Sequence, residues 1–595
     1  MRYCRMGFIC SIVMSWFAAL VCLAVFFLAV FFLTICGHVT ICMAEDQPLL
    51  APVPATDTVP ATDTIPATDT VPATDTVPAA DTVLLSVDET ARQADALFEA
   101  SWRSRHVIPA AAVSDAEYLR RIYLDLAGRI PAVSEVREFL SDPDSSRRDR
   151  VVEQLLDSPA YVRNFTTVWR NALIPQAASQ PQYRALIPGF EAWLWTQIAA
   201  DTPYDEVVRR IITIPVDSST AMTGVLNSAS SPEAFFVSRD LKPENAATGT
   251  SRAFLGVRLD CAQCHNHPFD RWKQQQFWQL AAFYADLPGA DTASSGMPSG
   301  SGGDATSHRS IRMPSTGELI PAIFLTGDTP AWTDSTSPRE VLADWLTDSR
   351  NPWFARMAAN RMWAQFFGRG LVHPVDDFSE NNAPAEPAVL DLLATQFVAH
   401  GYDLKFLIRT ITRTRVYRTG SRQTHESQAD ADAFARAALR GMTPEQFFDS
   451  LAEAVGYYQP FLANNPFLTD DSSPRGRFLE LYLDDAESPL QRQTTILQAL
   501  AMMNGDFIDQ ATSLEDSQTL RAVTEFPRMS DAERLETLSL ATVSRPPTAG
   551  ELATFLPYLE ASAQAAGETS SPGSREALGD VFWVLLNSSE FLLNH

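Results

Sequence analysis

Two cysteines and a histidine whose spacing suits covalent haem attachment lie near the middle of this 595-residue chain. They are Cys261, Cys264 and His265, in the order Cys-Ala-Gln-Cys-His. In this C-x-x-C-H pattern two thiols can add to the two vinyl groups of a haem, and the histidine that follows ligates the iron. The chain has seven cysteines, and the other five lie at or before Cys42. Two cysteines this close together in a large globular region indicate chemistry rather than a long-range cross-link.

Two other chemistries fit the same part of the sequence. In a second interpretation, one metal ion such as zinc is bound by Cys261, Cys264, His265 and His267. In the haem interpretation, His265 instead ligates the haem iron. Four ligands this close together strain tetrahedral geometry, because structural zinc sites space their ligand pairs further apart. In the third interpretation the two cysteines form a local disulfide or a redox-active dithiol. We favour haem and keep both alternatives open.

A second group of polar residues follows an expected helix in the C-terminal half. Gly368 and Gly370 are typical of a helix end. The polar residues are Arg361, Arg369, His373, Asp376 and Asp377. Paired carboxylates can perform general acid–base chemistry. Arginine–aspartate pairing beside a helix end is also common architecture, and we favour this structural interpretation over catalysis.

Residues 1–44 predict a membrane anchor. Arg2 and Arg5 precede a stretch, residues 7–44, that contains no Lys, Arg, Asp or Glu. The apolar core of a cleavable signal has about 7–15 residues, whereas a spanning helix needs about 20. We therefore expect an uncleaved signal anchor, with cleavage after Ala44 as the alternative. The positive flank predicts a single-pass protein of the cell membrane with most of the chain on the extracytoplasmic side.

Composition predicts a spacer after the anchor and excludes one class of partner. Residues 53–82 repeat the unit Val-Pro-Ala-Thr-Asp-Thr, so we expect residues 45–85 to form a disordered, extended linker. The formal net charge of the whole chain is −26. Since such an acidic chain repels phosphate backbones, nucleic acid is not an expected partner.

From about residue 86 onward the sequence is typical of a mainly α-helical protein. Start signals recur in which Ser or Thr precedes Glu or Gln by three residues and apolar residues follow at helical spacing. They begin at Ser114, Ser337, Thr443, Ser488 and Thr548. Residues 288–318 are rich in Gly, Ser, Thr and Pro and predict a flexible linker. It divides one helical globular region, residues 86–287, from a second, residues 319–595.

Longer stretches of the chain resemble two domain families that occur together. Residues 118–131, 155–161 and 254–270 resemble the planctomycete cytochrome-c-like domain family. Residues 351–363, 367–372, 376–378 and 401–409 resemble its usual C-terminal partner, a domain of unknown function. The resemblance implies a cytochrome-c-like helical domain over residues 86–287, followed by the partner domain over residues 319–595. It also implies an envelope or surface protein that carries haem c, but it implies no particular reaction.

These observations lead to three hypotheses of different classes. The first is a membrane-anchored protein of the bacterial cell envelope that binds one covalent haem c through Cys261, Cys264 and His265 and exchanges electrons with a redox partner protein. The second is a non-haem surface protein that binds a polymer or a partner, or acts in polysaccharide metabolism, with Cys261 and Cys264 as a local disulfide. The third is a hydrolase or lyase centred on His373, Asp376 and Asp377.

Overall fold

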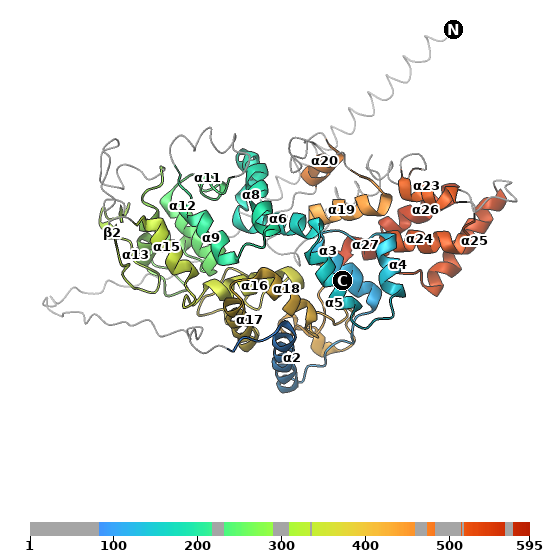
Figure 1. Ribbon diagram of the computed structural model, residues 1–595, viewed down its shortest axis with the longest axis horizontal. Helices are drawn as coiled ribbons and strands as arrows, with labels where there is room; N and C mark the ends of the chain where they lie inside the picture. The colour runs from blue at the N-terminus through green and yellow to red at the C-terminus, as the bar shows by residue number, and fades with distance from the viewer. Residues whose placement is uncertain are drawn as a thin grey trace, which may run out of the picture. The chain divides into compact units, whose positions relative to one another are not determined.

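The protein is mainly α-helical, as the sequence predicts (Figure 1). Two small antiparallel sheets lie among the described residues. The computed structural model describes residues 83–216, 231–288, 309–333, 336–458, 473–481, 513, 517–526, 528–565 and 575–595. All of them belong to one compact unit, Val71–His595. The predicted anchor, residues 1–44, and residues 45–82 of the predicted spacer lie outside the described residues. No helix within the described ranges has the length and apolar character needed to cross a membrane.

The first half of the described chain is a series of helices joined by short turns. The helices are α2 (Val87–Ser104), α3 (Asp115–Leu126), α4 (Val133–Ser141), α5 (Arg147–Leu156), α6 (Pro159–Leu173), α7 (Gln176–Ser179), α8 (Ile187–Ala199), α9 (Tyr204–Thr213), α11 (Ala234–Val237), α12 (Pro243–Thr250) and α13 (Gln274–Ala281). Tighter or wider helical turns lie between them: η1 (Pro181–Leu186), η3 (Ser251–Leu255), η4 (Asp260–Gln263) and η5 (Ala282–Tyr284).

The second half adds helices and both sheets. Its helices are α15 (Pro338–Thr347), α16 (Phe354–Phe367), α17 (Pro387–Ala399), α18 (Leu404–Arg413), α19 (Pro444–Val455), α20 (Pro474–Leu481), α23 (Gln518–Glu525), α24 (Asp531–Val543), α25 (Ala549–Ala565), α26 (Arg575–Leu586) and α27 (Ser589–Leu592). Two short turns, η7 (Glu426–Gln428) and η8 (Ala431–Ala433), lie between α18 and α19.

Each sheet has two strands. Strand β1 (Ser310–Arg312) pairs with β2 (Leu319–Pro321), so the end of the segment predicted as a flexible linker is structured. Strand β3 (Arg440–Gly441) pairs with β4 (Leu593–Asn594), which places the C-terminus beside residue 440.

The helix starts predicted from local sequence are confirmed wherever the structure describes them. At Ser114, Ser337 and Thr443 the side-chain hydroxyl accepts a hydrogen bond from the third backbone N–H of the helix, and the side chain at that position bonds back to the cap. Thr548 and Glu551 form the same pair of hydrogen bonds, at 3.2 and 2.6 Å. The start predicted at Ser488 lies outside the described residues.

Two hydrophobic clusters hold the helices together. The larger one contains buried side chains from α2 through α18, including Phe98, Phe235 and Trp363. The smaller one is built from α19 and the helices after it, joined by Leu124 and Ile130 from the first half. Both predicted globular regions therefore contribute to each cluster, and the boundaries at 86–287 and 319–595 stay predictions about sequence domains.

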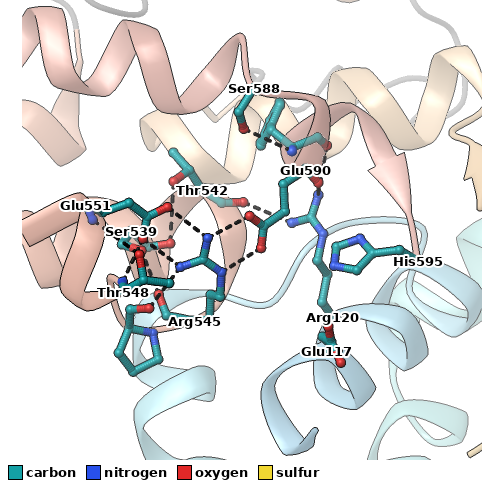
Figure 2. A network of polar contacts seen from close by, with 12 residues as sticks. Glu117, Arg120, Ser539, Thr542, Arg545, Thr548, Glu551, Ser588, Glu590 and His595 are labelled. Atoms are coloured by element: carbon teal, nitrogen blue, oxygen red, sulfur yellow. Dashed lines mark hydrogen bonds and ion pairs between the residues drawn. The ribbon is translucent and has the colours of Figure 1, made fainter. Parts of the chain in front are cut away.

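A polar network attaches the C-terminal helices to α3. Figure 2 shows the Arg545 guanidinium between two carboxylates, with hydrogen bonds of 2.9 Å to each oxygen of Glu551 and of 2.7 Å to each oxygen of Glu590. Arg120 of α3 donates to the backbone oxygens of Thr542, at 2.9 Å, and Phe591, at 2.7 Å. Charge-assisted hydrogen bonds of this kind are stronger than neutral ones, so the network fixes the starts of α25 and α27.

The change Glu551→Gln is expected to destabilise the protein near neutral pH and to matter less in acid. Hydrogen bonds from Arg545 lower the pKa of Glu551 from 4.5 to about 2. Because the folded pKa lies below the unfolded value, the ionised carboxylate stabilises the fold fully above about pH 4.5 and loses this contribution between about pH 4.5 and about pH 2. Urea unfolding midpoints of the wild type and the variant should therefore differ at about pH 7 and converge at about pH 2.

The matched control for this prediction is Glu560→Gln, on the exposed face of the same helix. It removes one negative charge from α25 without touching Arg545. We expect no pH-dependent difference from the wild type. A difference for Glu551→Gln that is constant from neutral pH to acid would contradict the prediction.

Candidate functional site

The Cys-x-x-Cys-His motif forms a turn on the protein surface. Cys261 lies in η4, Cys264 ends that turn, and His265 follows directly. Both thiols are free and exposed, and the imidazole of His265 is exposed as well. Ala262, between the cysteines, is completely buried and anchors the turn in the larger hydrophobic cluster. The fold therefore presents all three predicted haem-attachment residues to solvent on one turn.

Helix α13 holds the backbone of this turn. The Gln274 side-chain amide donates hydrogen bonds to the backbone oxygens of Gln263, at 3.1 Å, and Cys264, at 2.9 Å. The Trp278 indole N–H donates to the same Gln263 oxygen at 3.1 Å. Because Trp278 is buried in the larger hydrophobic cluster, these contacts connect an exposed motif to the core.

The two histidines of the motif have different roles. His265 Nδ1 lies 2.8 Å from the backbone oxygen of Asn266. A carbonyl oxygen only accepts, so this hydrogen bond places the proton on Nδ1 and leaves Nε2 with the lone pair that a metal needs. His267 Nδ1 instead accepts a hydrogen bond from the backbone N–H of Phe269 at 3.3 Å. The backbone N–H of His267 donates to the backbone oxygen of Trp272 at 2.8 Å. His267 thus shapes the turn, and its assignment as a metal ligand stays a prediction.

The motif does not gather its side chains around one point. Within the described ranges, no group of three or more His, Cys, Asp or Glu side chains has the arrangement needed to hold a metal ion. Such convergence is the requirement for a tetrahedral zinc site. It is not required for haem, because the thiols attach at the porphyrin edge whereas the imidazole reaches the iron at its centre.

Asp376, from the second predicted group, lies close to the segment that leads into the motif. Its carboxylate accepts hydrogen bonds from Arg252, at 2.7 Å, and from Arg258, at 2.6 and 3.1 Å. Burial alone would raise the pKa of Asp376, but the two guanidinium groups outweigh it and lower the pKa below its ordinary value. An ionised carboxylate already paired with two arginines suits a structural role better than proton transfer.

Two other members of that group, Arg361 and Arg369, have hydrogen-bond partners of their own. Arg369 pairs with Asp432 at 2.6 Å, and Arg361 donates to the backbone oxygen of Ala253 at 3.2 Å. Burial lowers the pKa of His373, which favours a neutral imidazole. The hydrogen bonds of Arg361, Arg369 and Asp376 thus go to different partners, although the charge of Arg369 also helps to lower the pKa of His373. These pairings favour the structural interpretation over a hydrolase or lyase centre.

Residues 376–381 run alongside the segment around the motif, which the sequence did not indicate. The Phe378 backbone N–H donates to the Gly256 oxygen at 2.8 Å, and the Asn381 side chain donates to the Phe269 oxygen at 2.7 Å. Arg271 pairs with Glu380 at 3.1 Å. These contacts join positions more than 100 residues apart, and no local pattern predicts them. They make the second half of the chain a support for the exposed turn.

Comparison with known proteins agrees with the order of the two resembling regions. Residues 93–288 match the model of the PSCyt2 family, described as a protein of unknown function (DUF1549), and residues 338–474 match that of the PSD1 family, described as a protein of unknown function (DUF1553). No curated protein and no solved structure matches the chain. The chain thus contains two regions similar to families of unknown function, in the order that the sequence motifs predict.

Proposed function

We propose that this protein is an electron-transfer protein of the cell envelope that attaches one haem through Cys261 and Cys264 and ligates its iron through His265. The observation that carries the proposal is the exposure of both free thiols and of the imidazole on one surface turn. Haem attachment needs thiols that are accessible to the vinyl groups and a histidine next to them in sequence. The residues present fit this requirement.

The surrounding residues support the same role. The hydrogen bond from His265 Nδ1 to Asn266 fixes the tautomer that leaves Nε2 free, and such contacts also hold the orientation of a ligating ring. Phe269 follows the motif in sequence and is 80% exposed, so an apolar ring is open to solvent a few residues after the attachment residues. When bound, the haem supplies a one-electron redox centre. The protein's own contribution is to hold the backbone of the motif against α13 and to leave the site open to a redox partner.

The envelope location rests on the N-terminal sequence. Residues 1–44 combine a basic flank with a long uncharged stretch, which is typical of a signal anchor. The same pattern predicts that the motif lies on the extracytoplasmic side of the membrane, where covalent haem attachment takes place.

The test is a pyridine haemochrome spectrum of the full-length chain, produced in cells that mature c-type cytochromes. We expect a reduced α-band that stays with the denatured polypeptide in the wild type and disappears in Cys264→Ala. His267→Ala is the matched control, because it changes the same turn without removing an attachment residue, and it should retain covalent haem.

Two results would overturn this function. The first is a colourless wild-type protein that is well folded by circular dichroism. The second is colour that persists in Cys264→Ala and is extracted by acidified solvent, which would indicate haem bound without attachment. In the colourless case, thiol titration before and after reduction would show whether Cys261 and Cys264 form a local disulfide instead.

A further inference from the structure

A pocket lies between helices α6, α8 and α9 and the start of α18. Helices α6 and α8 pack side by side (Figure 1). None of the lining residues belongs to the Cys261–His265 turn. Most of the wall is apolar and consists of Leu173, Leu194, Ile198, Val207, Val208 and Ile211. The cavity volume is about 40 Å³. One water molecule needs at least about 10–15 Å³ on this measure, so the pocket has room for roughly three or four non-hydrogen atoms.

The rim of the pocket is polar and carries opposite charges. Asp201, Asp403 and Lys405 all line it. Lys405 Nζ lies 2.8 Å from an Asp201 oxygen, and the Asp403 carboxylate accepts a hydrogen bond from the Lys405 backbone N–H at 2.8 Å. The lysine is thus already paired, and an entering carboxylate would meet two acidic side chains. These charges disfavour an anionic ligand.

Two buried polar groups belong to aromatic residues of the wall. The indole N–H of Trp169 and the hydroxyl of Tyr204 have no hydrogen-bond partner among the described residues, although the two side chains are only 3% and 2% exposed. Both residues line the pocket, and the centroids of their rings lie 5.0 Å apart. Buried polar groups nearly always have a partner, so two unsatisfied groups beside one cavity call for an acceptor that the protein chain does not provide.

We propose that this pocket binds a small neutral alcohol or ketone, or the corresponding end of a larger molecule. The aliphatic part would pack against the apolar wall, and the oxygen would accept a hydrogen bond from Trp169 Nε1. A ligand of about four non-hydrogen atoms buries little surface, so its dissociation constant should be on the order of millimolar. This site is independent of the haem proposal and would remain if the protein carried no haem.

The test compares acetone with isobutene, two molecules of the same shape that differ in the carbonyl oxygen. Binding to the full-length protein is measured by saturation-transfer NMR titration. We expect saturable binding of acetone and loss of acetone binding in Ile198→Phe, which fills the pocket from its partly exposed side. Isobutene serves as the apolar reference, because it can use only the apolar wall. Trp169→Phe keeps an aromatic ring but removes the N–H, and it should weaken acetone about tenfold while leaving isobutene unchanged.

Each alternative result overturns the proposal. A saturation-transfer signal of acetone that does not level off as its concentration rises, or that persists in Ile198→Phe, would show that acetone binds elsewhere. An unchanged acetone affinity in Trp169→Phe, or an equal loss of acetone and isobutene affinity, would show that no hydrogen bond from the indole is involved. Should Ile198→Phe fail to fold by circular dichroism, Val207→Phe fills the same pocket from α9 and replaces it.

Discussion

Replacing Asp125 with Ala is expected to lower the free energy of unfolding by about 3–5 kcal/mol, the usual cost of removing one partner of a buried ion pair. The Asp125 side chain is 0% exposed. It accepts hydrogen bonds from Arg440 at 2.8 and 3.0 Å, from the Tyr417 hydroxyl at 2.8 Å and from the Asn594 amide at 2.8 Å. Without the carboxylate, the buried Arg440 guanidinium keeps its charge and loses its counter-charge, so the folded state becomes less favourable.

The urea unfolding midpoint, followed by tryptophan fluorescence, measures this effect. The control is Asp344→Ala, because Asp344 is also paired with an arginine, Arg209, but its side chain is 63% exposed. Water replaces the lost contact there, and we expect a loss of about 0–1 kcal/mol. The loss of unfolding free energy in Asp125→Asn should lie between the losses in the two alanine variants, since the amide oxygen can still accept hydrogen bonds. Equal losses for Asp125→Ala and Asp344→Ala would contradict the prediction.

The contacts of Asp125 show where sequence reasoning reaches its limit. Ser114 and Glu117 predict the helix around it, because a capping box acts over three residues. The acid itself stands between Leu124 and Leu126, in a run that is otherwise apolar, which is a signal of a buried partner. The sequence does not identify that partner, because Tyr417, Arg440 and Asn594 are separated from Asp125 by 292, 315 and 469 positions.

The candidate site divides in the same way. The spacing of Cys261, Cys264 and His265 is local, so the sequence alone was enough to find these residues and to assign them a chemistry. The exposure of the turn and its attachment to α13 depend on packing and came only from the structure. Arg252 and Arg258, the partners of Asp376, were missed because arginines carry no pattern that names a distant acid. Asp376 was therefore grouped with its neighbours in sequence rather than with its true partners.

The change Gly256→Ala is expected to cost roughly 2–4 kcal/mol of stability, from backbone strain and steric overlap together. Gly256 follows η3 with a φ of +67°, a conformation that disfavours any side chain. A methyl group there would lie 2.5 Å from the Phe378 ring and 3.0 Å from the Met357 sulfur. Phe378 cannot move away freely, since its backbone N–H donates to the Gly256 oxygen at 2.8 Å.

Gly401→Ala separates the two causes. Gly401 has a similar φ of +64°, but a methyl group there would meet nothing within 4 Å. We expect it to cost only the strain, about 1–2 kcal/mol. The steric part should also shrink when Gly256→Ala is combined with Phe378→Leu, which removes the ring, and urea midpoints of the four proteins in this cycle measure the difference. If Gly256→Ala costs the same with and without the ring, then residues 376–378 do not pack against the segment leading to Cys261 as the structure shows.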